Sequence, residues 1–300
     1  MQHKRLCTWC VVLFSGLTVT AQTTPLSDYR WTLIDAKGEV TGRHENAFVE
    51  YKGKFYLLGG RGANPVNVFD PRTNTWEKLF NGENLDGWQI KCQEKDKGQT
   101  FWSVDKGAIY CNSLGSNNHG YVWLQSEKEF GDFALRLKFK VSRQNRGNSG
   151  IQIRSRYDEN AIVDEGGDAG WLDGPQVDIE PTNPWRNGLI YDETRETKRW
   201  INPSLPDWKI DKETWAPKRV IFYWEDEESG WNEMTIICQG THIKTIVNNV
   251  VVSDYDGAGI LDDKAHKKHN VGMYGYIALQ LHKNSENIIW FKDIEIRELN

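Results

Sequence analysis

Three short segments of this chain alternate between apolar and chemically reactive side chains, which predicts β-strands with one buried face. They are 148–156, 174–180 and 276–282. Because neighbouring side chains of a strand point to opposite faces, Ile151, Val177 and Leu279 would lie on the buried face. The opposite face would then carry Gln152, Arg154, Arg156, Gln176, Asp178, Glu180, Tyr276, Gln280 and His282.

These polar residues differ from those of an ordinary solvent-facing strand. Segment 133–141 is ordinary, because Arg136, Lys138 and Lys140 alternate there with apolar residues. Three strands that carry Gln, Asp, Glu and His instead favour a concave polar surface that recognises a ligand, since clefts collect such groups. The alternative is that these three strand faces are simply exposed to solvent and have no binding role.

The region 79–300 consists of short candidate strands separated by Gly, Asn, Asp and Pro turns, and helical periodicity is almost absent. Many short alternating strands are typical of a β-sandwich or jelly roll. We therefore predict an all-β protein whose main domain covers 79–300.

The preceding segment, 28–78, has a different pattern. Strand-like runs flank the Gly59-Gly60 doublet and are followed by Trp76, an order that resembles one kelch repeat, a single blade of a β-propeller. One blade cannot close a propeller ring. This kelch-like blade would therefore pack against the rest of the chain, be completed by another chain, or be the remnant of a gene fusion.

Residues 1–21 have the features of a secretory signal peptide. Lys4 and Arg5 precede an apolar run, and residues 19–21 are small enough for a cleavage site. No later apolar run approaches the roughly 18 residues of a membrane-spanning helix. We expect a secreted or periplasmic protein without a membrane span, and the net charge of −5 argues against a nucleic-acid partner.

A long irregular insertion, 157–217, interrupts the strand pattern, and such insertions in compact sandwiches are usually functional. It carries Trp171, Trp185, Trp200 and Trp208 among its tryptophans. Aromatic faces suit the C–H surface of a sugar ring, and the Asp and Arg residues between them suit its hydroxyls. We therefore expect a carbohydrate ligand. The candidate binding residues of this insertion are Trp171, Trp185, Tyr191 and Glu193, together with Gln176 on its strand.

Seven segments in order resemble the 3-keto-disaccharide hydrolase family over nearly all of 79–300. They are LFNGENLDGW, FWSVDKGAIYC, FGDFALRLKFKV, NSGIQIRS, GPQVDI, GYIALQLH and IIWFKDIEIREL. The resemblance implies a concanavalin-like β-sandwich that cleaves 3-keto-glycosides. In that chemistry, loss of the acidified C2 proton gives an enolate, which expels the glycosidic oxygen from C1 by β-elimination. Water then adds to the enone, so the net reaction is hydrolysis.

Such a site needs a general base near C2, an electrophile at the C3 oxygen and an acid for the leaving group. His282 titrates near neutrality and suits base or acid work. Asp178 and Glu180 lie two residues apart on one strand face and could share a proton. Arg154 suits polarisation of the C3 oxygen. Amide side chains suited to recognising hydroxyls are Gln176, Gln280 and Gln152.

A divalent metal ion is a further prediction, although no cofactor is certain. Asp178, Glu180 and His282 together offer a mixed carboxylate and imidazole ligand set, and the ion would serve as the electrophile for the enolate. The mature chain contains neither a CxxC nor an HExxH motif that would demonstrate such a site.

Each role has an alternative. His282 could be a satisfied structural histidine, and Asp178 and Glu180 could serve a turn or bind calcium. Arg154 could form a buried salt bridge with Asp178. For the whole domain, the alternatives are a non-catalytic carbohydrate-binding module and a conventional glycosidase with carboxylates about 5–9 Å apart. Two carboxylates on one strand row fit the glycosidase poorly.

Overall fold

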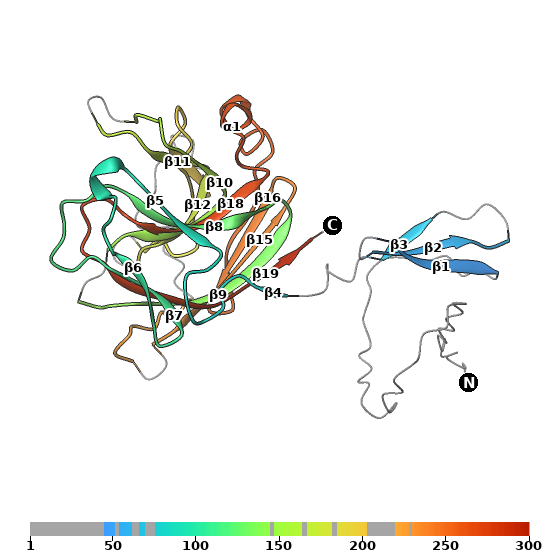
Figure 1. The fold of residues 1–300 in the computed structure, drawn as a ribbon, viewed down its shortest axis with the longest axis horizontal. Coiled ribbons are helices and arrows are strands. Elements are labelled where there is room, and N and C mark those ends of the chain that lie inside the picture. The colour runs from blue at the N-terminus through green and yellow to red at the C-terminus, as the bar shows by residue number, and fades with distance from the viewer. Residues whose placement is uncertain are drawn as a thin grey trace, which may run out of the picture. The chain divides into compact units, whose positions relative to one another are not determined.

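The computed structural model describes residues 45–51, 54–61, 66–69, 76–144, 147–163, 167–181, 185–202, 220–227 and 230–299 (Figure 1). The predicted signal peptide, 1–21, and Trp208 lie outside these residues. Secretion or a periplasmic location therefore stays a prediction. No helix among the described residues is long and apolar enough to cross a membrane.

A small antiparallel sheet forms within the segment expected to be a kelch-like blade. Its strands run in the order β1 (Asn46–Tyr51), β2 (Lys54–Gly59) and β3 (Asn67–Phe69). The ring of Phe48 on β1 stacks on that of Phe55 on β2, with ring centroids 5.3 Å apart. Three paired strands agree with a β-rich segment, whereas the kelch-like repeat and its contact with another chain stay predictions.

The main domain is a sandwich of two antiparallel sheets, so the predicted all-β fold is confirmed. The first sheet, here called the cleft sheet, has the order β14-β13-β12-β10-β18-β8-β5, with β11 paired to β10. Its strands are β5 (Trp88–Cys92), β8 (Val122–Phe130), β10 (Ser149–Asp158), β11 (Trp171–Asp173), β12 (Pro175–Ile179), β13 (Ile190–Asp192), β14 (Arg199–Asn202) and β18 (Gly275–Leu281).

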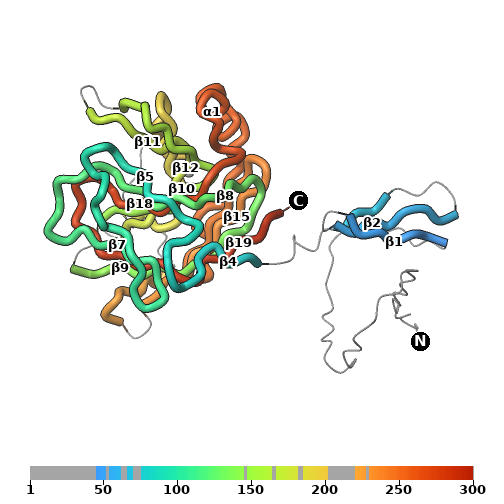
Figure 2. Tube along the Cα trace, in the orientation of Figure 1, coloured from blue at the N-terminus to red at the C-terminus, as the bar shows by residue number. Residues whose placement is uncertain are grey.

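The second sheet has the order β17-β16-β15-β9-β19-β7-β6, with β4 paired to β19. Its strands are β4 (Glu77–Lys78), β6 (Trp102–Asp105), β7 (Ala108–Asn112), β9 (Phe133–Val141), β15 (Asn232–Gln239), β16 (His242–Val247), β17 (Val250–Asp256) and β19 (Ile288–Glu298). In the described part of the sandwich, the helical elements are a short 3-10 turn at Glu94–Asp96 and α1 (Lys264–His269). Figure 2 traces the two layers, with β10 and β18 in one and β9 and β19 in the other.

The main core fills the space between the two sheets. The cleft sheet contributes the apolar residues of the predicted alternation, including Ile151, Val177 and Leu279, all fully buried. The second sheet faces them with residues such as Leu135 and Phe291. Each fully buried side chain of this kind contributes roughly 1.5–3 kcal/mol to folding, so the alternation fixes which face of each strand points outward.

The outer face of the cleft sheet is itself partly covered. Trp123, Ala161, Trp171, Leu172 and Ala278 form a second apolar cluster there, and all five are buried. The segment before β11 therefore folds back over the sheet. As a result, much of the predicted polar row lies beneath other residues instead of facing open solvent.

Candidate active site

A cleft of about 330 Å³ opens on the outer face of the cleft sheet, and we call it the main cleft. It is lined by Tyr121, Asn148, Trp171, Gln176, Asp178, Arg186, Tyr191, Glu193, Lys198, Trp200, His282 and Lys283. Six predicted site residues are thus brought together: His282, Asp178, Gln176, Trp171, Tyr191 and Glu193. Five of them lie between residues 171 and 193, and the sixth, His282, comes from a distant part of the sequence.

Strand register builds the floor of the main cleft. Asp178 on β12 pairs with Gly150 on β10, and Gly150 pairs in turn with Gln280 on β18. A Cβ atom at Gly150 would lie 2.5 Å from the side-chain amide carbon of Gln176, so glycine leaves the room that this amide occupies. Gln280 and Gln152 are fully buried in this floor and do not line the cleft.

A chain of amides orients the carboxylate of Asp178. Gln152 Nε2 donates to Gln176 Oε1 at 3.1 Å, and Gln176 Nε2 donates to Asp178 Oδ1 at 2.5 Å. Among the described residues, no hydrogen-bond partner reaches either amide atom of Gln280 or Oδ1 of Asn148. Buried amide atoms without a partner are costly, so Asn148, which lines the cleft, suits a ligand hydroxyl, and Gln280 suits ordered water.

Arg186 balances the charge of Asp178. Its Nε lies 3.3 Å from Asp178 Oδ2, and its Nη2 lies 3.5 Å from Glu180 Oε2. Burial raises the pKa of Asp178 to about 6, and the positive charge of Arg186 opposes that rise. Asp178 is therefore mostly ionised at neutral pH. Glu180 does not line the main cleft and instead holds Arg186 in place.

Glu193 lies just after β13 and has the opposite protonation state. Burial raises its pKa to about 8, with the negative charge of Asp178 adding to the effect. Its carboxyl is consequently protonated at neutral pH. The backbone at this position is fixed, because Trp171 Nε1 donates to the carbonyl oxygen of Glu193 at 2.8 Å.

His282 follows β18, and its neighbours define its tautomer. Its Nδ1 lies 3.0 Å from the carbonyl oxygen of Lys283, and its Nε2 lies 3.1 Å from the hydroxyl of Tyr121. A carbonyl oxygen only accepts, so Nδ1 carries the proton and Nε2 accepts from Tyr121. Burial lowers the pKa of His282. The imidazole is therefore neutral near pH 7 and presents a lone pair at Nε2.

Arg154 is not on the polar row, and this expectation is wrong for a local reason. The β10–β18 register shifts between Gln152 and Ser155, and Arg154 adopts a left-handed φ of 49° within this bulge. Its fully buried guanidinium donates to the carbonyl oxygens of Gly131, Gly240 and Gly272 at 2.6–3.2 Å and to Asp132 Oδ1 at 2.8 Å. The alternative of a salt bridge with Asp178 is also wrong, because the carboxylate partner is Asp132.

Two further predictions concern Trp185 and a metal ion. Trp185 is half-buried and does not line the main cleft.

Among the described residues, no group of three or more His, Cys, Asp or Glu side chains could hold a metal ion. Asp178 already pairs with Arg186, and Glu180 lies outside the cleft lining. The divalent ion stays a prediction.

The cleft also contains residues that the sequence analysis did not select as site residues. The first is Tyr121. Strand alternation could have placed it on the outer face, because Tyr121, Trp123 and Gln125 alternate with the apolar Val122 and Leu124. The other additions are Asn148, Arg186, Lys198, Trp200 and Lys283. Arg186, Lys198 and Trp200 belong to the long insertion, where no strand periodicity indicates direction.

The segment that carries Glu193 and Lys198 is anchored to α1 by a buried histidine. His266 Nδ1 lies 2.9 Å from Asp263 Oδ1, and His266 Nε2 lies 3.3 Å from Asp192 Oδ1. Burial lowers the pKa of His266, but the two carboxylates outweigh it, so the net pKa is raised. His266 thus holds the start of the Glu193 segment by an ion pair away from solvent.

Replacing His266 by glutamine should lower the free energy of unfolding by about 1–3 kcal/mol at pH 6. A raised folded-state pKa contributes stability that is complete below the unfolded pKa of about 6.5 and is lost as pH rises through the folded value. Urea midpoints should therefore differ more between His266→Gln and wild type at pH 6 than at pH 9. His242→Gln is the control, because the His242–Asp254 pair is half-exposed and should contribute little. A decrease in the free energy of unfolding that is the same at pH 6 and at pH 9 would contradict the proposed ion pair of His266.

The comparison with known families supplies the class of the domain. Residues 75–297 match the family described as the 3-keto-alpha-glucoside-1,2-lyase-like domain. The chain belongs to this family. Membership of the 3-keto-alpha-glucoside-1,2-lyase-like family supports a carbohydrate-related function for this domain. No curated protein matches the chain.

Solved structures with a similar architecture have low sequence identity. One is a candidate glycosyl hydrolase from Parabacteroides distasonis ATCC 8503, with 17% identity, coverage of 78% of this chain and 99% of that chain, and a TM-score of 0.48. A second candidate glycosyl hydrolase from the same organism has 22% identity, coverage of 75% and 100%, and a TM-score of 0.46. The carbohydrate-binding module CBM66 from Bacillus subtilis has 14% identity, coverage of 71% and 96%, and a TM-score of 0.37.

Proposed function

We propose that this protein cleaves 3-keto-glycosides by abstracting the C2 proton, eliminating the aglycone and adding water to the enone. One observation carries the proposal: the main cleft combines a neutral imidazole, an ion pair and a carboxyl that stays protonated at neutral pH. Elimination needs a base, a stabiliser of negative charge and an acid at the same time. The family match supports the same substrate class.

His282 is the base in this proposal. Its Nε2 lone pair is available when the hydroxyl of Tyr121 turns to another acceptor, such as a substrate oxygen. The Nδ1–H group continues to donate to the carbonyl oxygen of Lys283, which keeps the ring in a fixed orientation during proton transfer. Desolvation favours the neutral form, so the base remains competent at neutral pH.

Arg186 takes the role of electrophile that the sequence analysis gave to Arg154. A guanidinium in the cleft stabilises negative charge as it develops on the C3 oxygen. Asp178 holds this guanidinium through the contact at 3.3 Å. Because Asp178 is only partly neutralised, it also accepts a hydrogen bond from a sugar hydroxyl.

Glu193 is the acid that protonates the leaving oxygen. At neutral pH its carboxyl holds the proton that the departing aglycone requires, since its pKa is raised to about 8. Buried acids with raised pKa values are suited to this work near neutrality. After elimination, the resulting carboxylate accepts a proton from the water that adds at C1 of the enone, and the protonated His282 returns a proton to C2, so both residues regain their starting states.

The pH profile of kcat/KM should be bell-shaped, with an acid limb at about pH 6 and below, where Asp178 and the base His282 protonate, and an alkaline limb near pH 8, where Glu193 ionises. Glu193→Gln should remove the alkaline limb and lower the rate by about 10²-fold or more, because an amide cannot donate the proton to the leaving group. Initial rates from pH 5 to 9.5 measure both effects.

Glu196→Gln provides the matched control for Glu193. Glu196 lies on the same segment but is exposed and pairs with Lys268, so its replacement should leave the profile unchanged. An alkaline limb that persists in Glu193→Gln would mean that another group supplies the proton.

Hydrolysis in D₂O tests the elimination step itself. Removal of the C2 proton followed by hydration returns a deuteron to C2, and a reaction that stops at the enone leaves no hydrogen there. A conventional glycosidase displaces the aglycone at C1 and leaves the C2 proton in place. The product is sampled early, beside a control of free 3-keto-glucose in D₂O. Deuterium at C2 above the level of the control would establish removal of the C2 proton, whereas full retention of the original proton would favour direct displacement at C1.

The divalent ion is tested separately. Asp178 and His282 line the main cleft and are the residues that would hold it. Loss of activity after dialysis against EDTA, with recovery on adding a divalent cation, would establish the ion. Full activity after EDTA would show that the guanidinium of Arg186 suffices as the electrophile.

A further inference from the structure

The outer face of the second sheet carries a row of aromatic and basic side chains, which we call the basic row. Its members are Tyr110 on β7, Trp290 and Lys292 on β19, Lys140 on β9, and Trp231 just before β15. Their neighbours along these strands, such as Ile109, Phe139 and Phe291, belong to the core between the sheets. Because side chains alternate along a strand, the basic row points away from the core.

Strand register and ring contacts hold the basic row together. Trp290 pairs with Tyr110 on one side and with Lys140 on the other. The rings of Tyr110 and Trp290 stack with their centroids 5.1 Å apart. Lys140 Nζ lies 4.5 Å from the ring centroid of Trp290 and 4.8 Å from that of Trp231. Lys292 Nζ lies 4.2 Å from the ring centroid of Trp231, so both ammonium groups gather around one indole ring.

The two lysines of the basic row differ from other cations on this face of the sheet. Arg136 forms an ion pair with Glu295, and Lys138 Nζ lies 3.1 Å from Asp293 Oδ2. Within the described ranges, the contacts of the Lys140 and Lys292 ammonium groups are with aromatic rings, and neither forms an ion pair with a carboxylate. Each ammonium group has three donors, so a ring contact leaves donors for a ligand.

The proximity of these two charges opposes folding. Burial and the positive charge of Lys292 lower the pKa of Lys140, and the negative charges of Asp105 and Glu225 compensate only in part. Like charges on neighbouring strands are destabilising. A bound anion would relieve the repulsion and accept charge-assisted hydrogen bonds from both ammonium groups.

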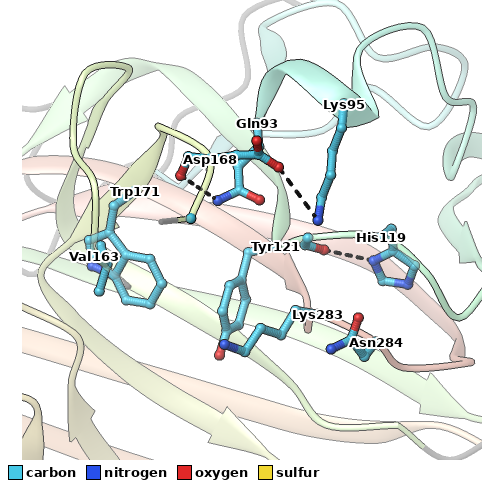
Figure 3. A pocket seen from close by; sticks show the side chains of 11 residues that line it. Gln93, Lys95, His119, Tyr121, Val163, Asp168, Trp171, Lys283 and Asn284 are labelled. Carbon is cyan, nitrogen blue, oxygen red and sulfur yellow. Dashed lines mark hydrogen bonds and ion pairs between the residues drawn. The ribbon is translucent and has the colours of Figure 1, made fainter. Parts of the chain in front are cut away.

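The basic row is separate from the proposed active site. The main cleft adjoins a second cavity of about 350 Å³, shown in Figure 3, and the two share Tyr121, Trp171 and Lys283 in their walls. Both cavities are built from the cleft sheet and its loops, and no residue of the basic row lines either of them. A ligand on the basic row would therefore leave the main cleft open.

The length of the basic row favours an extended ligand. It crosses β7, β19, β9 and the start of β15, which are neighbours in the second sheet. Four adjacent strands span about 14 Å, since each spacing is about 4.8 Å. A linear polymer that repeats its charge from unit to unit can follow such a row, whereas a small anion would occupy only one end.

We propose that the basic row is a binding site for an anionic polysaccharide. The aromatic rings offer apolar surface to the C–H groups of the sugar units, and the two lysines bind their carboxylate or sulfate groups. The net charge of the chain is −5, so most of its surface repels a polyanion and binding is confined to this row. The site would hold the domain on an acidic polysaccharide whatever reaction the main cleft performs.

Isothermal titration calorimetry of the full chain tests the site with polygalacturonate, dextran sulfate and uncharged dextran. Wild-type protein should bind at least one polyanion, which identifies the anionic group, and should not bind dextran. Raised salt should weaken binding, because exposed charges are screened. Lys140→Met and Lys292→Met each remove one ammonium group and keep an apolar stem beside the rings. Each should lower the affinity about tenfold, the effect of one hydrogen bond to a charged group.

Lys138→Met is the matched control, because Lys138 lies on the same strand and face as Lys140 but pairs with Asp293 and Glu233. It should bind the polyanion like wild type, and melting temperatures verify that all three variants are folded. Binding of neither polyanion, equal binding of dextran, or unchanged affinity in both Lys140→Met and Lys292→Met would overturn the inference. Equally tight binding of double-stranded DNA would also overturn it, because charge alone would then suffice.

Discussion

His282→Ala should lower kcat/KM for a 3-keto-glucoside by about 10²–10⁴-fold, the usual contribution of a positioned general base. Alanine removes the Nε2 lone pair that we propose takes the C2 proton, and it leaves the hydroxyl of Tyr121 without this acceptor. The loss should fall mainly on kcat, because the imidazole acts in the transition state more than in substrate binding.

Two comparisons make the His282 experiment specific. His242→Ala removes an exposed imidazole from the second sheet and should leave kcat/KM unchanged. Added imidazole should partly restore the activity of His282→Ala, because the cavity left by the ring can admit a small base, and it should do nothing for wild type. Activity within a few-fold of wild type in His282→Ala would show that another group removes the proton.

Arg154→Lys should lower the free energy of unfolding by about 3–5 kcal/mol, the usual effect of breaking a buried charge pair. Lysine keeps the charge but cannot reproduce the planar fork that contacts three carbonyl oxygens and Asp132 at once. For a domain of this size, the melting temperature should fall by roughly 6–20 °C. Differential scanning calorimetry measures it directly.

A surface substitution calibrates the effect at Arg154. Lys97→Gln removes an exposed ion pair with Glu94 and should change stability by less than about 1 kcal/mol. At a temperature where both variants are folded, Arg154→Lys should keep most of its activity. A variant that is as stable as wild type but inactive would return Arg154 to the catalytic role that the sequence suggested.

Strand alternation predicted the sandwich and three residues of the main cleft, Gln176, Asp178 and His282, because it depends only on local geometry. Ile151, Val177 and Leu279 are buried as expected, and Gln176 and Asp178 face outward into the cleft. The same rule fails after Gln152, where one residue with a left-handed φ shifts the register. Arginine is not a residue type that indicates a bulge with a left-handed φ, so the sequence does not predict the bulge at Arg154.

The remaining site residues depend on contacts between distant segments. Arg186 reaches Asp178 because the β12–β13 loop folds back, with the backbone N–H of Arg186 donating to the carbonyl oxygen of Glu180 at 2.9 Å. Glu193 has a raised pKa because other segments bury it. Periodicity within one segment cannot show what covers it. The sequence therefore indicated carbohydrate chemistry more securely than it indicated the individual roles.

Cleavage of a 3-keto-glucoside with a chromogenic aglycone, run beside the unoxidised glucoside, tests the central claim most directly. The account predicts release of the chromophore from the keto form alone, because only the ketone acidifies the C2 proton that elimination removes. Release from the ordinary glucoside at a similar rate would contradict it and indicate a conventional glycosidase. Release from neither substrate, with sugar binding retained, would contradict it equally and indicate a carbohydrate-binding module.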